Sequence, residues 1–291
     1  MKKQLFVTTF CSLLLAGYGC SSPQANDAMQ DLTQYVDPYI GSGGHGHVFV
    51  GANVPYGLVQ LGPSSIPQEW DWTSGYHISD STVIGFPHMH LSGTGIGDLH
   101  DITLMPVVGE VTYARGVESD QTSGLWSYSD RSKEVVKPGY YATHLLRYNV
   151  DVELTATKRV GFHKYTFNQK ENAAVVFDLQ NGGCWDSPTK AYINKVDDKT
   201  IEGYRYSSGW ANDQRVFFVA EFSEPITSLD VIVDRGEAVA DKGEGKIVYA
   251  RANVDAQKPV YVKVALSPTS IENAKLNMQT ELPGWDFEGT I

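Results

Sequence analysis

Pro259-Val-Tyr-Val-Lys-Val-Ala-Leu266 is the stretch that decides the fold class of this 291-residue chain. Valines at positions 260, 262 and 264 alternate with Tyr261, Lys263 and Ala265. A side-chain period of two is that of a half-buried β-strand. Similar runs, separated by turn-forming residues, occur upstream at Gly161–Phe167, Ala173–Leu179, Thr200–Tyr206, Arg215–Phe222 and Lys246–Arg251. Regularly spaced strands separated by turn-forming residues predict an all-β fold, an antiparallel β-sandwich.

Residues 34–110 are rich in Gly, His and aromatic residues and show no helical period. This pattern is typical of short strands joined by long, structured loops. We therefore assign residues 34–268 to one β-sandwich domain. A chain of this length can bury a core of that size.

The pattern changes over residues 269–291. Thr269 and Glu272 have the spacing of a capping box, which predicts a helix start. One helical face then carries Ile271, Ala274, Met278 and Leu282. Pro283-Gly284 ends the helix, and the apolar pair Trp285 and Phe287 has little sequence left to pack against. We interpret this segment as the beginning of a linker to a further domain.

The N-terminus has the features of an export signal. Lys2 and Lys3 precede an apolar run from Leu5 to Ala16, which is too short for a permanent membrane span. The run leads to Gly17-Tyr-Gly-Cys20, which resembles a bacterial lipoprotein cleavage site. We expect residues 1–19 to be a signal peptide, Cys20 to be lipidated, and residues 20–33 to be a flexible tether. Secretion without lipidation is the alternative.

These features place the mature protein in a Gram-negative cell envelope, in the periplasm or at the cell surface, held by a lipid anchor alone. The chain is acidic, since 23 basic and 34 acidic residues in the full sequence give a formal charge of -11. An acidic surface repels phosphate backbones, so we expect no nucleic-acid partner.

Histidines cluster in the N-terminal part of the domain, and two pairs have the spacing His-x-His. The pairs are His45/His47 and His88/His90. On a strand this spacing places both rings on one face, so that with nearby carboxylates they could bind zinc or iron in a metal-dependent hydrolase. Alternatively, the rings brace loops through hydrogen bonds to the backbone.

A third kind of site is suggested by Trp70-Asp71-Trp72 and Tyr76-His77. These segments combine flat apolar rings with hydrogen-bonding groups. Sugar rings offer an apolar C–H face and directed hydroxyls, so this combination indicates carbohydrate binding.

Long motifs in the same region resemble glycoside hydrolase family 92. They are Tyr35-Val-Asp-Pro-Tyr-Ile-Gly-Ser-Gly-Gly-His-Gly-His47, Pro55-Tyr-Gly-Leu-Val-Gln-Leu-Gly-Pro63, Trp70-Asp-Trp-Thr-Ser-Gly-Tyr-His-Ile-Ser-Asp-Ser81 and Gly85-Phe-Pro-His-Met-His-Leu-Ser-Gly-Thr-Gly95. The resemblance implies an exo-acting α-mannosidase that inverts configuration, requires calcium and acts on α-mannoside glycans. It also implies a galactose-mutarotase-like super-sandwich, followed by helical linkers and an (α/α)6 barrel.

In that family the catalytic acid, the base and most of the calcium shell belong to the barrel. No Asp or Glu of this chain matches a catalytic position, so we expect the chain alone to be inactive, with the barrel supplied in cis or by a split gene. The resemblance points to Trp70–His77 as a substrate contact, with Trp72 our first choice. The pairs His45/His47 and His88/His90 would then brace the loops. Calcium prefers oxygen ligands, which makes a histidine cluster a poor calcium site.

Three hypotheses therefore stand: the substrate-contacting domain of an α-mannosidase, a stand-alone carbohydrate-binding lipoprotein, and a metal-dependent hydrolase built on the histidines.

Overall fold

The computed structural model describes residues 32–182 and 185–291. The predicted signal peptide, Cys20 and nearly all of the tether lie outside these residues. By its contacts the chain divides into Met1–Gln34 and Tyr35–Ile291, and the second unit holds all the sheets. No helix of the described part is long and apolar enough to cross a membrane.

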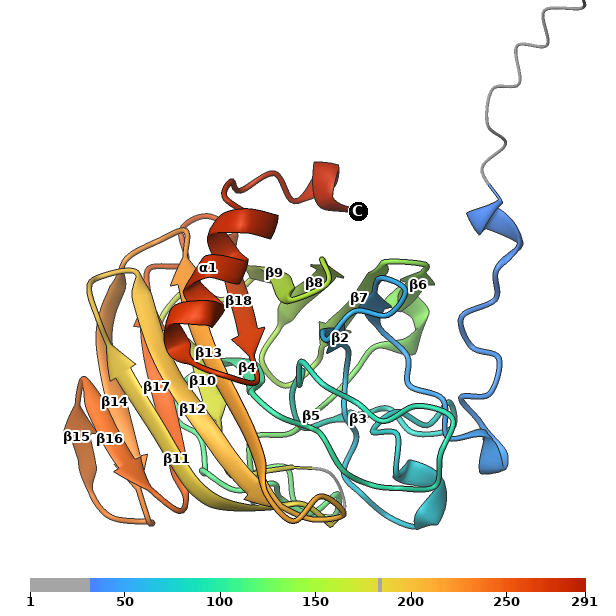
Figure 1. Ribbon diagram of the computed structural model, residues 1–291, viewed down its shortest axis with the longest axis horizontal. Coiled ribbons are helices and arrows are strands. Elements are labelled where there is room, and N and C mark those ends of the chain that lie inside the picture. The colour runs from blue at the N-terminus through green and yellow to red at the C-terminus, as the bar shows by residue number, and fades with distance from the viewer. Residues whose placement is uncertain (1–31, 183–184) are drawn as a thin grey trace, which may run out of the picture. The chain divides into compact units, whose positions relative to one another are not determined.

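Strands dominate the described residues (Figure 1). The strands are β1 Ala52–Asn53, β2 Gln60–Leu61, β3 Thr82–Val83, β4 Thr103–Val108, β5 Ser127–Tyr128, β6 Val135–Lys137, β7 Tyr140–Leu145, β8 Val150–Ala156, β9 Val160–Phe167, β10 Ala173–Asp178, β11 Ser187–Lys195, β12 Thr200–Ser208, β13 Gln214–Phe222, β14 Ile226–Val233, β15 Ala238–Ala240, β16 Lys242–Gly245, β17 Val248–Val254 and β18 Val260–Ser267. The α-helix is α1 Ile271–Glu281, and the 3-10 helices are η1 Thr33–Tyr35, η2 Gly44–Gly46, η3 Trp70–Trp72, η4 Arg131–Lys133 and η5 Glu288–Thr290.

Two large sheets form the domain. The nine-stranded sheet has the order β16-β11-β12-β13-β18-β9-β8-β7-β6, and the five-stranded sheet has the order β15-β14-β17-β10-β4. Every strand pairing in both sheets is antiparallel. Phe177 of β10 packs against Phe218 and Phe222 of β13, with ring centroids 5.9 and 6.2 Å apart, so the core lies between the sheets. The predicted antiparallel β-sandwich is confirmed.

The strand β18 lies near the middle of the nine-stranded sheet, and its alternation is as predicted. Val260, Val262 and Val264 point into the core and are fully buried. The other face is also buried, because α1 packs against it. Lys263 lies on that face, where its Nζ donates to the Leu282 carbonyl at 3.1 Å. The prediction of a half-buried strand was therefore wrong for β18, since the covering helix belongs to a later part of the chain.

The helix α1 buries the face that the sequence predicts, through Ala274 and Met278. Its N-cap, however, is Ser270, whose side chain accepts from the Asn273 backbone N–H at 3.1 Å. The predicted capping box at Thr269 is wrong. The Thr269 hydroxyl is instead engaged by the Asn273 side-chain amide, at 2.8 Å.

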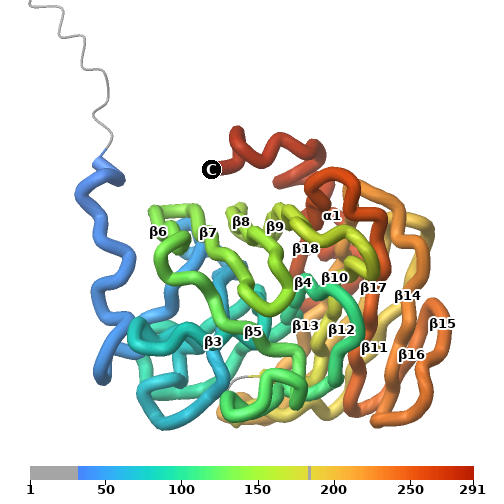
Figure 2. The backbone as a smooth tube through the Cα atoms, turned by 180° about the vertical axis from the view of Figure 1, so that it is seen from behind, coloured from blue at the N-terminus to red at the C-terminus, as the bar shows by residue number. Residues whose placement is uncertain are grey.

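The apolar pair that follows α1 does find packing partners. Phe287 is 3% exposed and packs edge-on against Phe162, with centroids 5.1 Å apart, and against Tyr261. Trp285 stays 40% exposed, and the Lys263 Nζ lies 4.2 Å from its ring centroid. Figure 2 shows this dark red segment running from α1 toward β8. The expectation of an unpacked end was wrong because the segment folds back onto β9 and β18.

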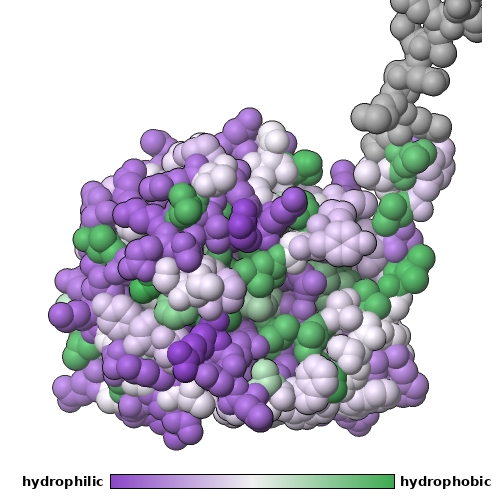
Figure 3. All heavy atoms as spheres, in the orientation of Figure 1, coloured by the Kyte–Doolittle hydropathy of each residue, from purple (hydrophilic) through white to green (hydrophobic). Residues whose placement is uncertain are grey.

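The face of the domain that Figure 3 draws is mainly hydrophilic. In Figure 3, in the orientation of Figure 1, hydrophobic residues are scattered between polar ones rather than gathered over the sheet. Isolated apolar side chains of this kind are normal on a soluble surface. No large apolar patch covers the sheet on this face, so the loops are the better candidates for a functional site.

Candidate functional site

The segment η3 is held in place by the first histidine pair. The Trp70 ring lies 4.2 Å from the His47 ring, and the Trp70 Nε1–H donates to the Gly95 carbonyl at 3.0 Å. The His45 Nδ1 lies 2.6 Å from an Asp71 carboxylate oxygen. Trp70 nevertheless remains 54% exposed. These contacts fix an indole at the surface in one orientation.

Trp72, two positions later, is more enclosed. His77 stacks on it with centroids 4.3 Å apart and an interplanar angle of 19°, and the Trp72 Nε1–H donates to Asp80 at 2.7 Å. One face of this ring is therefore already covered. His77 is itself held by the Ser79 hydroxyl, 2.7 Å from its Nδ1. Of the two indoles, Trp70 offers the larger free surface.

Tyr76 does not reach the surface with its neighbours. It is buried, its hydroxyl donates to Glu134 at 3.0 Å, and the Arg131 guanidinium lies over its ring at 4.8 Å. Glu134 also accepts from the hydroxyls of Tyr39 and Tyr141. Because Tyr76 belongs to this buried cluster, the structure separates it from the exposed indole of Trp70.

His88 belongs to a fully buried hydrogen-bonded chain. Its Nδ1 lies 2.5 Å from the Ile102 carbonyl and must donate, so its Nε2 accepts from the His163 Nε2–H at 2.9 Å. The His163 Nδ1 in turn accepts from the Tyr165 hydroxyl at 2.7 Å. Burial lowers the pKa of His88 to about 4, so both rings are neutral near pH 7. Both nitrogens of His88 are thus used within the protein.

His90 also makes contacts within the core. Its Nδ1 lies 2.7 Å from the Gln60 carbonyl, and its Nε2 lies 3.4 Å from the Ser64 hydroxyl, which is equally distant from His100. Burial lowers the pKa of His90 to about 4. Among residues 32–182 and 185–291, no three His, Cys, Asp or Glu side chains come together in a metal-binding group.

Three exposed tryptophans are attached to one short segment, Gly95–Asp98. Trp70 donates to the Gly95 carbonyl, the Trp185 backbone N–H donates to the Gly97 carbonyl at 2.9 Å, and the Trp210 backbone N–H donates to Asp98 at 2.9 Å. Trp185 and Trp210 are 51% and 71% exposed. We call these three residues the tryptophan face.

Sequence reasoning missed Trp185 and Trp210. The available signal was their position in turn-rich connections, Trp185 between β10 and β11 and Trp210 between β12 and β13. Aromatic residues in such loops need not pack in the core. Flat indoles beside polar loop groups suit the apolar face of a sugar ring.

A buried ion cluster ties these loops together. Arg205 on β12 is fully buried, and its Nη1 lies 2.7 Å from both Asp101 and Asp186. Its Nε–H donates to the Leu179 carbonyl at 3.0 Å. Burial raises the pKa of Asp101 to about 6, while the Arg205 charge opposes this shift. The cluster joins the connection before β4 to the one between β10 and β11.

The carboxylates near the tryptophan face are engaged by donors. Both oxygens of Asp101 accept, one from Arg205 and one from Gln214, and both oxygens of Asp186 accept from Arg205. Asp98 accepts from two backbone N–H groups, and burial raises its pKa. These groups therefore offer neither a free acid–base pair nor an open cage of oxygen ligands.

Comparison with known proteins gives a family match. The model of the glycosyl hydrolase family 92 N-terminal domain matches residues 35–267. A structure of the family GH92 α-mannosidase BT3965 from Bacteroides thetaiotaomicron, in complex with mannoimidazole, is similar at 34% identity and a TM-score of 0.84, over 89% of this chain and 35% of that one.

Two matches are more distant in sequence. The GH92 family glycosyl hydrolase ccman5 is 22% identical with a TM-score of 0.77, over 89% of this chain and 35% of that one. An "Uncharacterized secreted glycosidase" from Arthroderma benhamiae is 24% identical, over 89% of this chain and 36% of its own length. The chain thus spans about a third of the length of the relatives it matches.

Proposed function

Because this chain belongs to glycosyl hydrolase family 92, whose N-terminal domain matches residues 35–267, we propose that it forms the substrate-contacting domain of a calcium-dependent, inverting α-mannosidase. The observation that carries the proposal is the tryptophan face. Its three tryptophans come from three separate connections, and all three are bonded to one segment, Gly95–Asp98: Trp70 through its indole, and Trp185 and Trp210 through their backbone N–H groups. Terminal mannose of an α-mannoside glycan is the proposed ligand.

In this proposal Trp70 stacks on the apolar face of a sugar ring, and Trp72 contacts the leaving-group sugar through its uncovered side. His47 and His77 lie against these two indoles, and each has a buried Nε2 without a hydrogen-bond partner in the described part of the chain. His45 and Asp71 orient η3, while His88 and His90 brace the loops behind it.

Inverting hydrolysis needs a carboxylic acid on one side of the glycosidic bond and a carboxylate base on the other. The carboxylates near the tryptophan face are already bonded to donors, and their arrangement does not fit a calcium site. We therefore assign the acid, the base and the calcium shell to an (α/α)6 domain, present in cis or encoded separately. The chain alone is proposed to bind but not to hydrolyse.

The proposed location is the cell envelope of a Gram-negative bacterium, with the protein exported and anchored through lipidated Cys20. The likeness to a relative described as a secreted glycosidase supports export. Metabolic labelling with a radioactive fatty acid tests the anchor, since Cys20→Ser should abolish incorporation.

A second candidate is a stand-alone carbohydrate-binding lipoprotein. It is favoured by the exposure of Trp70, Trp185 and Trp210, because exposed indoles can stack on sugar rings without any catalytic group. This candidate predicts binding that no added domain converts into turnover.

The test is to incubate the purified chain with α-mannobiose, first with calcium and then with EDTA, and to measure binding by calorimetry. We expect saturable binding and no mannose release in either condition. Trp70→Ala should weaken binding about tenfold, while Trp285→Ala, an exposed indole outside the tryptophan face, should leave it unchanged. Calcium-dependent release by the chain alone would show that catalytic carboxylates lie within it. Release only after adding a separately expressed barrel domain would distinguish the half-enzyme from the stand-alone binder.

A further inference from the structure

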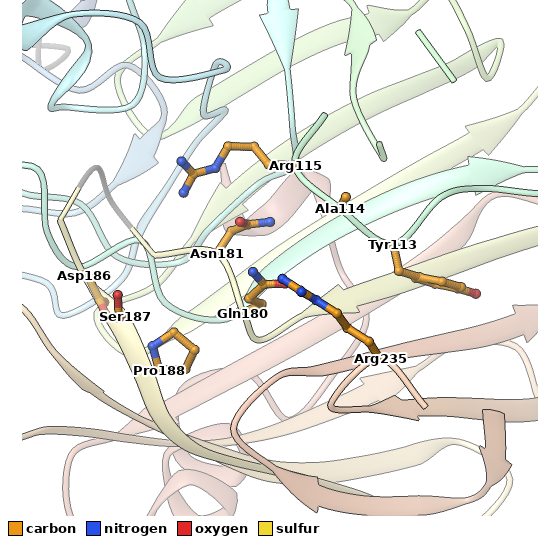
Figure 4. A pocket seen from close by; sticks show the side chains of 9 residues that line it. All are labelled: Tyr113, Ala114, Arg115, Gln180, Asn181, Asp186, Ser187, Pro188 and Arg235. Atoms are coloured by element: carbon orange, nitrogen blue, oxygen red, sulfur yellow. The ribbon is translucent and has the colours of Figure 1, made fainter. Parts of the chain in front are cut away.

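A cavity of about 510 Å³ has none of Trp70, Trp185 and Trp210 among the described residues that line it. Its walls come from the connection between β4 and β5, the segment after β10, the first residues of β11 and the turn between β14 and β15. The lining residues whose side chains could donate hydrogen bonds to a ligand are Arg115, Gln180, Asn181, Ser187 and Arg235 (Figure 4). A cavity of this size is within the range that holds a small ligand.

Two arginines in this pocket lack anionic partners. In the part of the chain that the structure describes, neither Arg115 nor Arg235 takes part in an ion pair. The Arg115 Nε is buried and has no hydrogen-bond partner there. A buried guanidinium donor left without an acceptor costs free energy, which an anionic ligand would recover.

The neighbouring carboxylates make their hydrogen bonds to groups other than these two arginines. Asp186 lines the pocket, but both of its oxygens accept from Arg205. Asp178 lies behind the pocket and accepts from the backbone N–H groups of Gln180 and Asn181 and from the Asn181 side chain. The pocket thus holds two arginines that form no ion pair in the described part of the chain, although the charge of Arg115 opposes the rise in pKa that burial causes at Asp178.

The backbone fixes the position of Arg235. Asp234 and Arg235 have φ angles of 49° and 64° in the turn between β14 and β15, a left-handed conformation that normally favours Gly or Asn. The Asp234 carboxylate faces the other way, where it accepts from the backbone N–H groups of Lys246 and Ile247. An arginine is therefore held at the pocket rim by a turn that does not favour its backbone.

Neutral donors complete the lining. The Gln180 Oε1 accepts from the Tyr249 hydroxyl at 2.7 Å, which leaves the Gln180 amide N–H₂ as the free end of that side chain. Burial and the Asp178 charge raise the pKa of Tyr249, and the charges of Arg115 and Arg235 oppose this rise, so both guanidinium groups are within electrostatic reach of the hydroxyl. In Figure 4 the Arg235 side chain extends toward Gln180, and Asn181 lies between it and Arg115.

We propose that this pocket binds an oxyanion, either free or carried as a carboxylate or sulfate group on a small sugar. Guanidinium groups match the geometry of such anions with paired N–H donors, and the amide and hydroxyl groups nearby can hold the remaining polar atoms. The site goes beyond the proposed function, because neither of its arginines contacts the tryptophan face. Whether the pocket binds an oxyanion therefore does not depend on whether the chain binds a mannoside.

The experiment is calorimetric titration of the purified chain at constant, low ionic strength with sulfate, glucuronate and, as the neutral control, glucose. We expect saturable binding of sulfate and glucuronate with one site per chain, and none of glucose. Arg115→Gln and Arg235→Asn should each weaken binding about tenfold to a hundredfold, as expected for loss of a charged hydrogen bond. Asn is chosen at position 235 because it tolerates a positive φ.

Arg215→Gln is the matched control, since it removes one exposed arginine outside the pocket and should leave the affinity unchanged. Tighter binding of glucuronate than of sulfate would identify a sugar-borne anion, and the reverse order a free one. No saturable binding of either anion would overturn the proposal, as would equal affinities in the wild type and the folded Arg235→Asn variant. Because Arg235 is exposed, the Arg235→Asn variant should fold and still test the proposal even if Arg115→Gln does not fold.

Discussion

Replacing Arg205 by Met tests the buried ion cluster most directly. The side chain has no exposed surface and donates to Asp101, Asp186 and the Leu179 carbonyl. Met fills a similar volume, so the change removes the charge and the donors while largely preserving packing. Two carboxylates then remain buried without their guanidinium.

The expected cost at pH 7 is about 3–5 kcal/mol of unfolding free energy, the range found when one partner of a buried ion pair is removed. Since a whole domain is stable by only about 5–15 kcal/mol, this loss would be a large fraction of its stability. The cost follows from the desolvation of Asp101 and Asp186 rather than from the lost attraction alone.

The cost should also depend on pH. In the wild type the pKa of Asp101 is raised to about 6 from 3.8, so its contribution to stability is present below 3.8 and is lost as the pH rises through 6. Without Arg205 the opposing charge disappears and this pKa rises further. Protonation of Asp101 at pH 5 then neutralises that carboxylate, and the variant should be about 1–2 kcal/mol less destabilised there than at pH 7.

The assay is urea unfolding at pH 5 and pH 7, followed by intrinsic fluorescence and far-UV circular dichroism. Arg215→Met is the control, because Arg215 is exposed, pairs with the exposed Asp213 and lies over the Tyr206 ring. It should change stability by less than about 0.5 kcal/mol at either pH. A loss below about 1 kcal/mol for Arg205→Met, or a loss that grows toward pH 5, would refute the reasoning.

Three further changes test the packing and the surface charges. Phe287→Ala should lower the unfolding free energy by about 2–4 kcal/mol in urea, because the ring is buried against β9; a neutral effect would mean that the segment does not pack there. Gly161→Ala should cost about 1–3 kcal/mol, since the new methyl would lie 2.6 Å from the His88 ring, whereas Gly284→Ala, with open space around it, should be neutral by the same measurement. Asp151→Asn should destabilise by less than about 1 kcal/mol near pH 7, because hydrogen bonds and a nearby histidine lower the pKa of that carboxyl. This difference should vanish as the pH falls below the carboxyl's ordinary pKa of 3.8, as thermal melts at pH 3 and pH 7 would reveal.

Much of the fold could be predicted from local patterns. The alternation in Pro259–Leu266 marks β18, and the run Ala173–Leu179 marks β10, because the period of side chains along a strand is a local property. The helical face with Ala274 and Met278 is predicted for the same reason. The family motifs between Tyr35 and Gly95 likewise need no tertiary information.

Local patterns also place the first part of the candidate site but misjudge how it is arranged. The motif from Trp70 to His77 marks the right segment, yet Tyr76 lies in the interior, and Trp72 is covered by His77 on one face. Which ring of such a motif is exposed depends on what packs above it. That packing partner comes from elsewhere in the chain, so the motif alone cannot indicate it.

The sequence by itself thus determined the strands, the helix face and the family of this protein. Only the tertiary structure decided that Trp185 and Trp210 join Trp70 at Gly95–Asp98, and that Arg205 meets Asp101 across 104 positions of sequence. The physical reason is that periodicity reports the environment of each element separately. Which loops meet is determined by strand order and sheet packing, which bring distant segments together at the same end of the sandwich.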